Sequence, residues 1–405
     1  MLIRKDYLAW MHQQRRSPFA KVLTGLRRVG KSTLLQQFET TLLEEGLPRQ
    51  NILLVDIEQL AFRHIHSAAD LDKAVKAGFD GIQGERFLLV DEVQEIQGWE
   101  HAIASLLKEG GIDIYLTGSN AQLLSSDLAT YLAGRYVQKD VYSFSYAEYL
   151  AFKGETRHSS ALFRSYIKHG GFPGIQYLPD DDTLRFQALN DLYSSIILRD
   201  VVERYKVRNV ALLERLILFF FDNIGQPVSA RSITAYLKSQ RLQVSTETIL
   251  SYIGYLESCH ALYRTSRYDI KGKRHLEINE KHYLGDLGLR HAILGEREGD
   301  IAQILENLVF LELKRRGYAV STGLLDGYEV DFVAEKHEQR LYIQVSLLLA
   351  SPETREREFR PLRSIPDAWP KIVLSMDELT RDEAGIRHRY LPDFLLAPQA
   401  AGDTW

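Results

Sequence analysis

A glycine-rich segment near the N-terminus constrains this chain more than any other feature. Residues 25–32 read Gly-Leu-Arg-Arg-Val-Gly-Lys-Ser, two glycines with four residues between them, followed by Lys and Ser. The segment lies between the apolar run 21–24 and a helical pattern, and this strand-loop-helix context is the one in which such a motif cradles phosphates. Gly25 and Gly30 let backbone amides approach phosphate oxygens, and the next helix adds a partial positive charge. The motif predicts a nucleotide site.

The residue types in this motif suggest separate roles. Lys31 offers a point charge to the β and γ phosphates, and the Ser32 hydroxyl is a ligand for Mg²⁺. Arg28, Val29 and Thr33 complete the set of expected nucleotide contacts. Arg27 and Arg28 either stabilise charge on a phosphate or are ordinary surface arginines, and the sequence leaves both alternatives open.

A second motif, which is acidic, makes it much harder to explain the glycine-rich motif as a chance match. Residues 87–92 read Phe-Leu-Leu-Val-Asp-Glu, an apolar strand that ends in two carboxylates. Ligands of open α/β sheets bind at the carboxyl ends of the strands. We therefore expect Asp91 to hold Mg²⁺ and Glu92 to orient and deprotonate the attacking water.

Two further polar residues are candidates at the same edge. Asn120 follows the apolar run 112–116, and it either positions the water and senses the γ-phosphate or caps the next helix. Arg135 follows a glycine and either reaches a phosphate, in its own subunit or a neighbour's, or is an ordinary surface arginine. The residue pattern leaves both alternatives open.

The motifs together resemble the prokaryotic AAA+-type ATP-binding proteins. The resemblance rests on the phosphate loop, on Asp91-Glu92-Val93-Gln94 with Gly98-Trp99-Glu100, and on residues 116–119 and 132–136. Residues 170–173, 198–201 and 329–332 are similar to the domain of unknown function that accompanies this ATPase module. The resemblance implies ATP and Mg²⁺ as cofactors, ATP hydrolysis, nucleotide-dependent oligomers, and an appended winged helix and restriction-nuclease-like end.

Hydrophobic periodicity predicts an α/β protein. Short apolar runs at 21–24, 51–55, 87–90 and 112–116 are separated by helix-length stretches, which is typical of a buried parallel sheet. We expect a P-loop NTPase sheet in residues 1–143 and a helical connector or lid in 144–208, broken at 170–174. A winged helix is expected in 209–290, and a degenerate restriction-endonuclease-like α/β domain in 291–405.

The predicted winged helix has an ambiguous surface. Helices are expected at 230–238 and 246–257, and β segments at 262–268 and 275–278. The second helix begins Thr-Glu-Thr-Ile-Leu-Ser-Tyr, without Lys or Arg, which argues against tight docking in a DNA major groove. The turn with Lys271, Lys273 and Arg274 either binds a DNA or RNA backbone or is a solvated basic hairpin. A module that packs against neighbouring subunits is equally compatible with the sequence.

The predicted terminal domain is incomplete as a nuclease. Glu306 on a helix and Asp331 on a strand match two metal-binding positions of such a site. Alternatively, Glu306 is an ordinary exposed acid of an amphipathic helix and Asp331 a carboxylate beside a turn. Where the pattern requires an acid, one residue and a lysine, this chain has Gln344-Val345-Ser346. A neutral amide is a weaker ligand for Mg²⁺, and serine carries no charge. Lys336 and Lys371 are candidate spatial substitutes, so the pattern favours a degenerate fold over an active nuclease.

Composition excludes several other classes. Fifty Lys and Arg against 54 Asp and Glu give a net charge of −4, so no global basic field attracts nucleic acid. Cys259 is the single cysteine, which excludes an internal disulfide and a cysteine-based zinc finger and suits the cytoplasm. The charged N-terminus lacks the apolar core of a signal peptide, and the apolar run 216–221 is too short to span a membrane.

The leading prediction is a cytoplasmic, Mg²⁺-dependent ATPase that forms a homo-oligomer and couples ATP binding and hydrolysis to rearrangement of the C-terminal modules, with DNA or RNA as a candidate partner. One alternative is a nucleotide-gated protein-binding switch or scaffold with slow hydrolysis. The other alternative is an ATP-regulated, metal-dependent nuclease.

Overall fold

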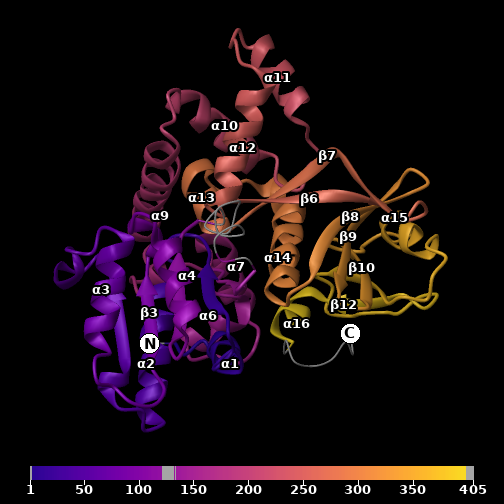
Figure 1. The fold of residues 1–405 in the computed structure, drawn as a ribbon. Helices are drawn as coiled ribbons and strands as arrows, with labels where there is room; N and C mark the ends of the chain where they lie inside the picture. Colours follow the sequence, from indigo (N-terminus) through magenta and orange to yellow (C-terminus); the bar gives the residue numbers. More distant parts are fainter. Residues whose placement is uncertain (1, 121–131, 133, 398–405) are drawn as a thin grey trace. The chain divides into compact units, whose positions relative to one another are not determined.

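The computed structural model describes residues 2–120, 132 and 134–397. The chain divides into two units (Figure 1). The N-terminal unit comprises Met1–Ser143 with Ser258–His260, and the C-terminal unit comprises Phe144–Glu257 with Ala261–Trp405. Each unit has a sheet of its own, in keeping with the α/β class that periodicity predicts.

The N-terminal unit is built around a five-stranded parallel sheet in the order β2-β3-β4-β1-β5. Its strands are β1 (Ala20–Thr24), β2 (Ile52–Asp56), β3 (Phe87–Asp91), β4 (Asp113–Gly118) and β5 (Tyr136–Asp140). Helix α1 (Lys5–Gln13) precedes β1, and the helices between the strands are α2 (Lys31–Glu44), α3 (Ala68–Gly78) and α4 (Trp99–Glu109). The first four strands lie where the apolar runs predict them, whereas the half-exposed β5 has no comparable run.

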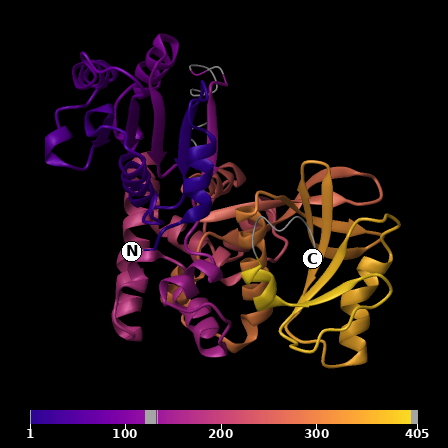
Figure 2. The same cartoon turned by 90° about the horizontal axis from the view of Figure 1, so that it is seen from below.

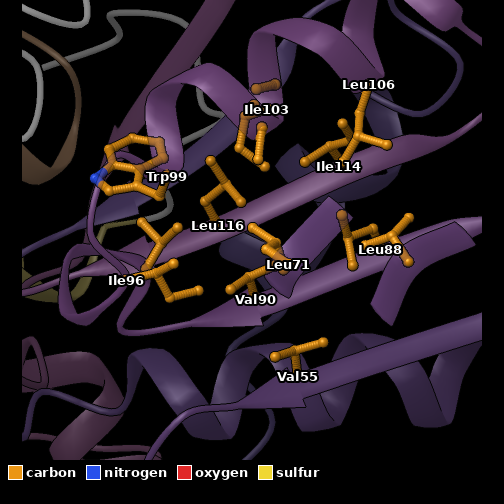
Figure 3. Packing of buried hydrophobic residues seen from close by; sticks show 14 of the residues in the cluster. Val55, Leu71, Leu88, Val90, Ile96, Trp99, Ile103, Leu106, Ile114 and Leu116 are labelled. Atoms are coloured by element: carbon orange, nitrogen blue, oxygen red, sulfur yellow. The ribbon is translucent and has the colours of Figure 1, made fainter. Parts of the chain in front are cut away.

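The core of this unit forms between the sheet and the helices that connect its strands. Strands β1 and β3 are buried at every residue, as expected for a parallel sheet covered on both faces. Helix α3 begins at a capping box in which Ser67 and Asp70 satisfy each other's backbone amides. Side chains of β2, β3 and β4 pack against α3 and α4 in one cluster (Figure 3), which includes Val55, Leu71, Leu88, Val90, Ile103, Leu106, Ile114 and Leu116.

The C-terminal unit begins with helices and a break at the predicted position. Helix α7 ends at His169, where Gly170 adopts a φ of 69°. The amide of Gly171 donates to Asp286 Oδ2 at 2.8 Å, and Pro173 begins the next helix. The helices here are α6 (Tyr146–Phe152), α7 (Ser160–His169), α8 (Pro173–Gln176), α9 (Asp182–Ser195), a π-helical segment (Ile196–Glu203), α10 (Val210–Asp222), α11 (Ala230–Ser239), α12 (Thr246–Ser258) and α13 (Leu287–Leu294).

The sheet of this unit has seven strands in the order β12-β11-β10-β9-β8-β6-β7 (Figures 1 and 2). The predicted hairpin of the winged helix, β6 (Leu262–Asp269) with β7 (Arg274–Leu284), forms one edge of this sheet, because β6 pairs in parallel with β8. The remaining strands are β8 (Ala319–Leu325), β9 (Tyr328–Lys336), β10 (Gln339–Val345), β11 (Lys371–Ser375) and β12 (Arg387–Tyr390). The division of residues 144–405 into a connector and two domains stays a prediction.

Three helices complete the unit: α14 (Ile301–Arg315), α15 (Pro352–Arg363) and α16 (Leu391–Leu396). On β9, the ring of Phe332 lies 6.3 Å from that of Phe310 on α14, whereas the next residue, Val333, packs in a cluster with Phe359 of α15. Successive side chains of a strand point to opposite faces, so α14 and α15 cover opposite faces of the sheet. No helix among the described residues is long and apolar enough to cross a membrane.

Candidate nucleotide site

The predicted phosphate loop follows β1 and leads into α2. Gly25 has a φ of 152°, and a Cβ at this position would lie 2.1 Å from the carbonyl oxygen of Val141. Gly30 has a φ of 97° and is the N-cap of α2. Both conformations favour glycine, which explains the spacing of the motif in backbone terms. Arg28 has a φ of 61° and its side chain is exposed, while Val29 is fully buried.

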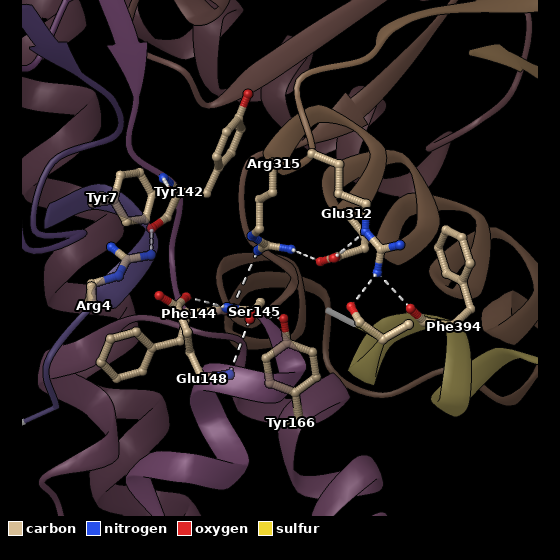
Figure 4. A network of polar contacts seen from close by, with 12 residues as sticks. Arg4, Tyr7, Tyr142, Phe144, Ser145, Glu148, Tyr166, Glu312, Arg315 and Phe394 are labelled. Atoms are coloured by element: carbon tan, nitrogen blue, oxygen red, sulfur yellow. Dashed lines mark hydrogen bonds and ion pairs between the residues drawn. The ribbon is translucent and has the colours of Figure 1, made fainter. Parts of the chain in front are cut away.

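Arg4 holds this loop from outside the motif. Its Nη1 donates to the carbonyl of Val29 at 3.1 Å, and its Nη2 donates to the carbonyl of Tyr142 at 3.0 Å (Figure 4). The guanidinium also lies 4.4 Å from the centre of the Tyr7 ring. Arg4 therefore joins the phosphate loop to the segment that follows β5, a role that its place in the charged N-terminus does not indicate.

Lys31 lies under the loop, with 3% of its surface exposed. Its Nζ donates to the carbonyls of Gly25 and Leu26 at 3.0 and 3.1 Å, and lies 4.0 Å from Glu92 Oε1. The structure thus brings the predicted phosphate-binding lysine and the predicted base to the same point.

The predicted metal ligands also meet. The Ser32 hydroxyl and Thr117 both hydrogen-bond to the carboxylate of Asp91. Burial raises the pKa of Asp91, and these two hydrogen bonds offset only part of the increase. A buried carboxylate beside a hydroxyl at the start of a helix fits Mg²⁺ held together with a nucleotide. Burial makes the negative charge of the carboxylate costly, and the positive charge of the ion would compensate it.

Thr117 organises the acidic pair from the neighbouring strand. It lies at the end of β4 and is fully buried. Its hydroxyl contacts Asp91 Oδ1, and its Oγ1 accepts a hydrogen bond from the amide of Glu92 at 2.9 Å. The polar cluster after residues 112–116 marks this edge, but nothing in the pattern distinguishes Thr117 from its neighbours.

The remaining predicted residues are placed less directly. Asn120 is buried, with 8% of its surface exposed, and the segment that it would cap, residues 121–131, lies outside the described residues, as does Ala133 of the quoted motif. Arg135 donates from Nε to the carbonyl of Leu132 at 3.2 Å. Ser32 and Thr33 are half-buried. The roles of Asn120, Arg135 and Thr33 therefore stay predictions.

Comparison with known proteins agrees with this geometry. Residues 17–150 match the model of an AAA domain, and residues 160–300 match that of a domain of unknown function. An uncharacterised protein from Haemophilus influenzae is 36% identical over 98% of this chain and 99% of its own length. This chain belongs to the AAA+ family of P-loop proteins. An uncharacterised protein from Methanocaldococcus jannaschii is 28% identical to this AAA+ protein over 84% of the chain and 77% of its own length.

Solved structures similar to this AAA+ protein match at low overall similarity. The Orc1 protein of Aeropyrum pernix, solved in complex with DNA, has a TM-score of 0.30 and 11% identity over 72% of this chain and 92% of its own. AMPPCP-bound DnaA from Aquifex aeolicus has a TM-score of 0.31 and 13% identity over 64% and 89% of the two chains.

The C-terminal unit of this AAA+ protein contains a second cluster of carboxylates, in a cleft of about 660 Å³. Glu306 of α14 and Asp331 of β9 both line it, together with Gln344. Lys281 of β7 donates from Nζ to Glu306 Oε1 at 2.9 Å and lies 2.8 Å from Glu329 Oε1. Lys281 stands 25 residues before Glu306 on a strand that no nuclease pattern marks, so the sequence pattern missed it.

The charges in this cleft compensate one another. Burial alone would lower the pKa of Lys281, but the carboxylates of Glu306 and Asp331 outweigh it and hold that pKa above its usual range. Burial, and then the charge of Glu306, raises the pKa of Asp331 well above its ordinary value. No group of three or more metal-binding side chains was found among the described residues. The ammonium of Lys281 pairs with Glu306 and Glu329 and would compete with a divalent cation for the same oxygens, so this set of side chains does not fit the expected metal site.

The basic turn is also partly neutralised. Lys271 lies 3.1 Å from Asp326 Oδ1, and Arg274 lies 3.5 Å from Asp269 Oδ2. Lys271, Lys273 and Arg274 are all exposed. Surface pairs of this kind are weak and can be exchanged for phosphate contacts.

Proposed function

We propose that this AAA+ protein binds ATP with Mg²⁺ and hydrolyses it to ADP and phosphate. The proposal rests on the convergence of Lys31, Asp91 and Glu92, all buried, at the carboxyl edge of one parallel sheet. Lys31 Nζ lies 4.0 Å from Glu92 Oε1. Ser32 and Asp91 would hold Mg²⁺, which neutralises charge on the phosphates when bound.

The protein's own residues divide the work as follows. The backbone of the phosphate loop and Lys31 bind the β and γ phosphates. Glu92, held at a φ of 51° directly after β3, accepts a proton from the attacking water. The Glu92 amide donates a hydrogen bond to Thr117 Oγ1, which restrains the backbone from which the Glu92 side chain extends.

The test is Glu92→Gln, measured by phosphate release and by binding of a fluorescent ATP analogue. Removal of a general base costs about 10²- to 10⁴-fold in turnover, whereas binding is expected to stay within about twofold of the native value. Glu95→Gln, three residues along on the same turn, is the matched control and should turn over normally. Native turnover in Glu92→Gln would show that the base is assigned wrongly.

We further infer that the nucleotide state acts on a partner through the C-terminal unit. Nucleic acid would bind through Lys271, Lys273 and Arg274, which are all exposed, and the surface pairs of Lys271 with Asp326 and of Arg274 with Asp269 are weak. Turnover measured with and without DNA and RNA separates the alternatives. Strong stimulation supports a nucleic-acid machine, and indifference supports the protein-binding switch. Light scattering with a nonhydrolysable analogue tests the homo-oligomer.

Nuclease activity is not part of the proposal. Lys281 provides the lysine that the sequence pattern lacks, but the same ammonium is engaged by Glu306 and Glu329. Intact plasmid and single-stranded DNA after incubation with Mg²⁺, Mn²⁺ and ATP would agree with this reading. Cleavage that disappears in Glu306→Gln would overturn it.

A further inference from the structure

Gln94 lies directly beside the proposed base. It belongs to the one-turn 3-10 segment Val93–Glu95, which begins immediately after Glu92. Glu92 adopts a left-handed φ of 51°, so the chain changes direction at the end of β3 instead of continuing outward. The side chain of Gln94 consequently returns to Glu92, and its Nε2 donates a hydrogen bond to Glu92 Oε2.

The two halves of the Gln94 amide are used differently. A carboxylate accepts but does not donate, so the NH₂ group is the half that faces Glu92. The other half, Oε1, is buried and has no hydrogen-bond partner among the residues that the structure describes. A buried acceptor without a donor is unfavourable, so the native site is expected to supply a donor at this atom.

The two oxygens of Glu92 are also distinguished. Oε2 accepts the hydrogen bond from Gln94, whereas Oε1 is the oxygen 4.0 Å from Lys31 Nζ. Gln94 thereby sets the rotation of the carboxylate, with one oxygen toward the phosphate-binding lysine.

We propose that Gln94 is a positioning residue for ATP hydrolysis, an inference that rests on the proposed function. Its NH₂ group donates to Glu92 Oε2 and so holds the other oxygen of the carboxylate, the one that deprotonates the attacking water, toward Lys31. The water oxygen then bonds to the γ-phosphorus as the bond to the ADP oxygen breaks, and Glu92 holds the proton. Gln94 gains and loses no proton in this step.

The chemistry explains why an amide is required at this position. Glutamate would have the same length but could not donate to Glu92, and its charge would repel the carboxylate. Alanine would remove the hydrogen bond to Glu92 Oε2 and with it this restraint on the rotation of the carboxylate. Because a small misplacement of a reacting group costs up to about 10²-fold in rate, both changes should reduce kcat more than nucleotide affinity.

The experiment compares Gln94→Ala and Gln94→Glu with the native chain. Each variant is expected to lose about 10- to 100-fold in kcat while the Kd of a fluorescent ATP analogue stays within about twofold. Gln176→Ala is the matched control, since Gln176 also donates from Nε2, to the carbonyl of Gly170, and has a buried Oε1 without a partner among the described residues. Circular-dichroism melting checks that every variant folds.

A double-variant cycle separates positioning from a structural role. With Glu92→Gln already present, Gln94→Ala should change single-turnover hydrolysis by less than about twofold, because Gln94 acts through the base that is missing. An equal loss in both backgrounds, or native kcat in Gln94→Ala, would overturn the inference. Absence of turnover in the native chain would instead overturn the proposed function, so the two failures are distinguishable.

Discussion

The two carboxylate clusters of this protein differ in what their lysine contacts. In the N-terminal unit, Lys31 donates to two backbone carbonyls and stays 4.0 Å from Glu92. In the C-terminal unit, Lys281 lies 2.9 and 2.8 Å from the oxygens of Glu306 and Glu329. The first arrangement can exchange neutral carbonyl partners for phosphate. The second is an ion pair that a ligand would have to break, so acids and a lysine at a sheet edge do not by themselves define a phosphate site.

The largest expected effect concerns the first lysine. Lys31→Ala should abolish measurable ATP turnover and weaken nucleotide binding at least about 10²-fold, because Lys31 is the residue proposed to place a positive charge against the β and γ phosphates. Binding of a fluorescent ATP analogue and phosphate release measure the two losses. Lys76→Ala on α3, an exposed lysine in surface pairs with Asp72 and Glu109, is the control and should behave as native. Full turnover in Lys31→Ala would remove the basis of the comparison.

The second lysine should matter for stability rather than for nucleotide. Lys281 is 4% exposed in its side chain, so Lys281→Met leaves buried carboxylates without their partner and should destabilise the C-terminal unit by about 3 kcal/mol. Urea denaturation followed by circular dichroism gives the loss. Lys271→Met in the exposed turn should change stability by less than about 0.5 kcal/mol.

The sharper form of this test adds Glu306→Gln to Lys281→Met. Removing both charges should restore part of the lost stability, because the uncompensated carboxylate is then neutral. ATP turnover should be near native in the single variant at temperatures where it is folded. A stable Lys281→Met protein that gains tight Mn²⁺ binding would show that the cleft is a masked metal site instead.

The smallest expected effect concerns Thr117, which contacts the acidic pair of the N-terminal unit. Thr117→Val preserves shape but removes the hydroxyl that contacts Asp91 and accepts from the amide of Glu92. We expect about a tenfold loss in kcat, equivalent to about 1.4 kcal/mol, with little change in stability measured by thermal melting. Thr41→Val, which removes only a hydroxyl bonded to the carbonyl of Gln37 within α2, is the matched control.

The sequence predicted the N-terminal unit better than the C-terminal one for a physical reason. In a parallel sheet buried on both faces, strands are continuous apolar runs, so β1 to β4 are visible as 21–24, 51–55, 87–90 and 112–116. Strands β5 and β12 are short and partly exposed, and they carry no such run. The hairpin β6–β7 was expected, but its parallel pairing with β8 depends on residues more than fifty positions apart.

The same distinction holds for the sites. Residues 25–32 and the pair Asp91-Glu92 are identifiable from sequence, because backbone conformation and strand ends require those residue types at local spacing. Tertiary structure alone decided that Arg4 holds the loop, that Thr117 ties the acidic pair together and that Lys281 neutralises Glu306. Such contacts join distant segments of the chain, and hydrogen bonds and ion pairs of this kind leave no periodic pattern in the sequence.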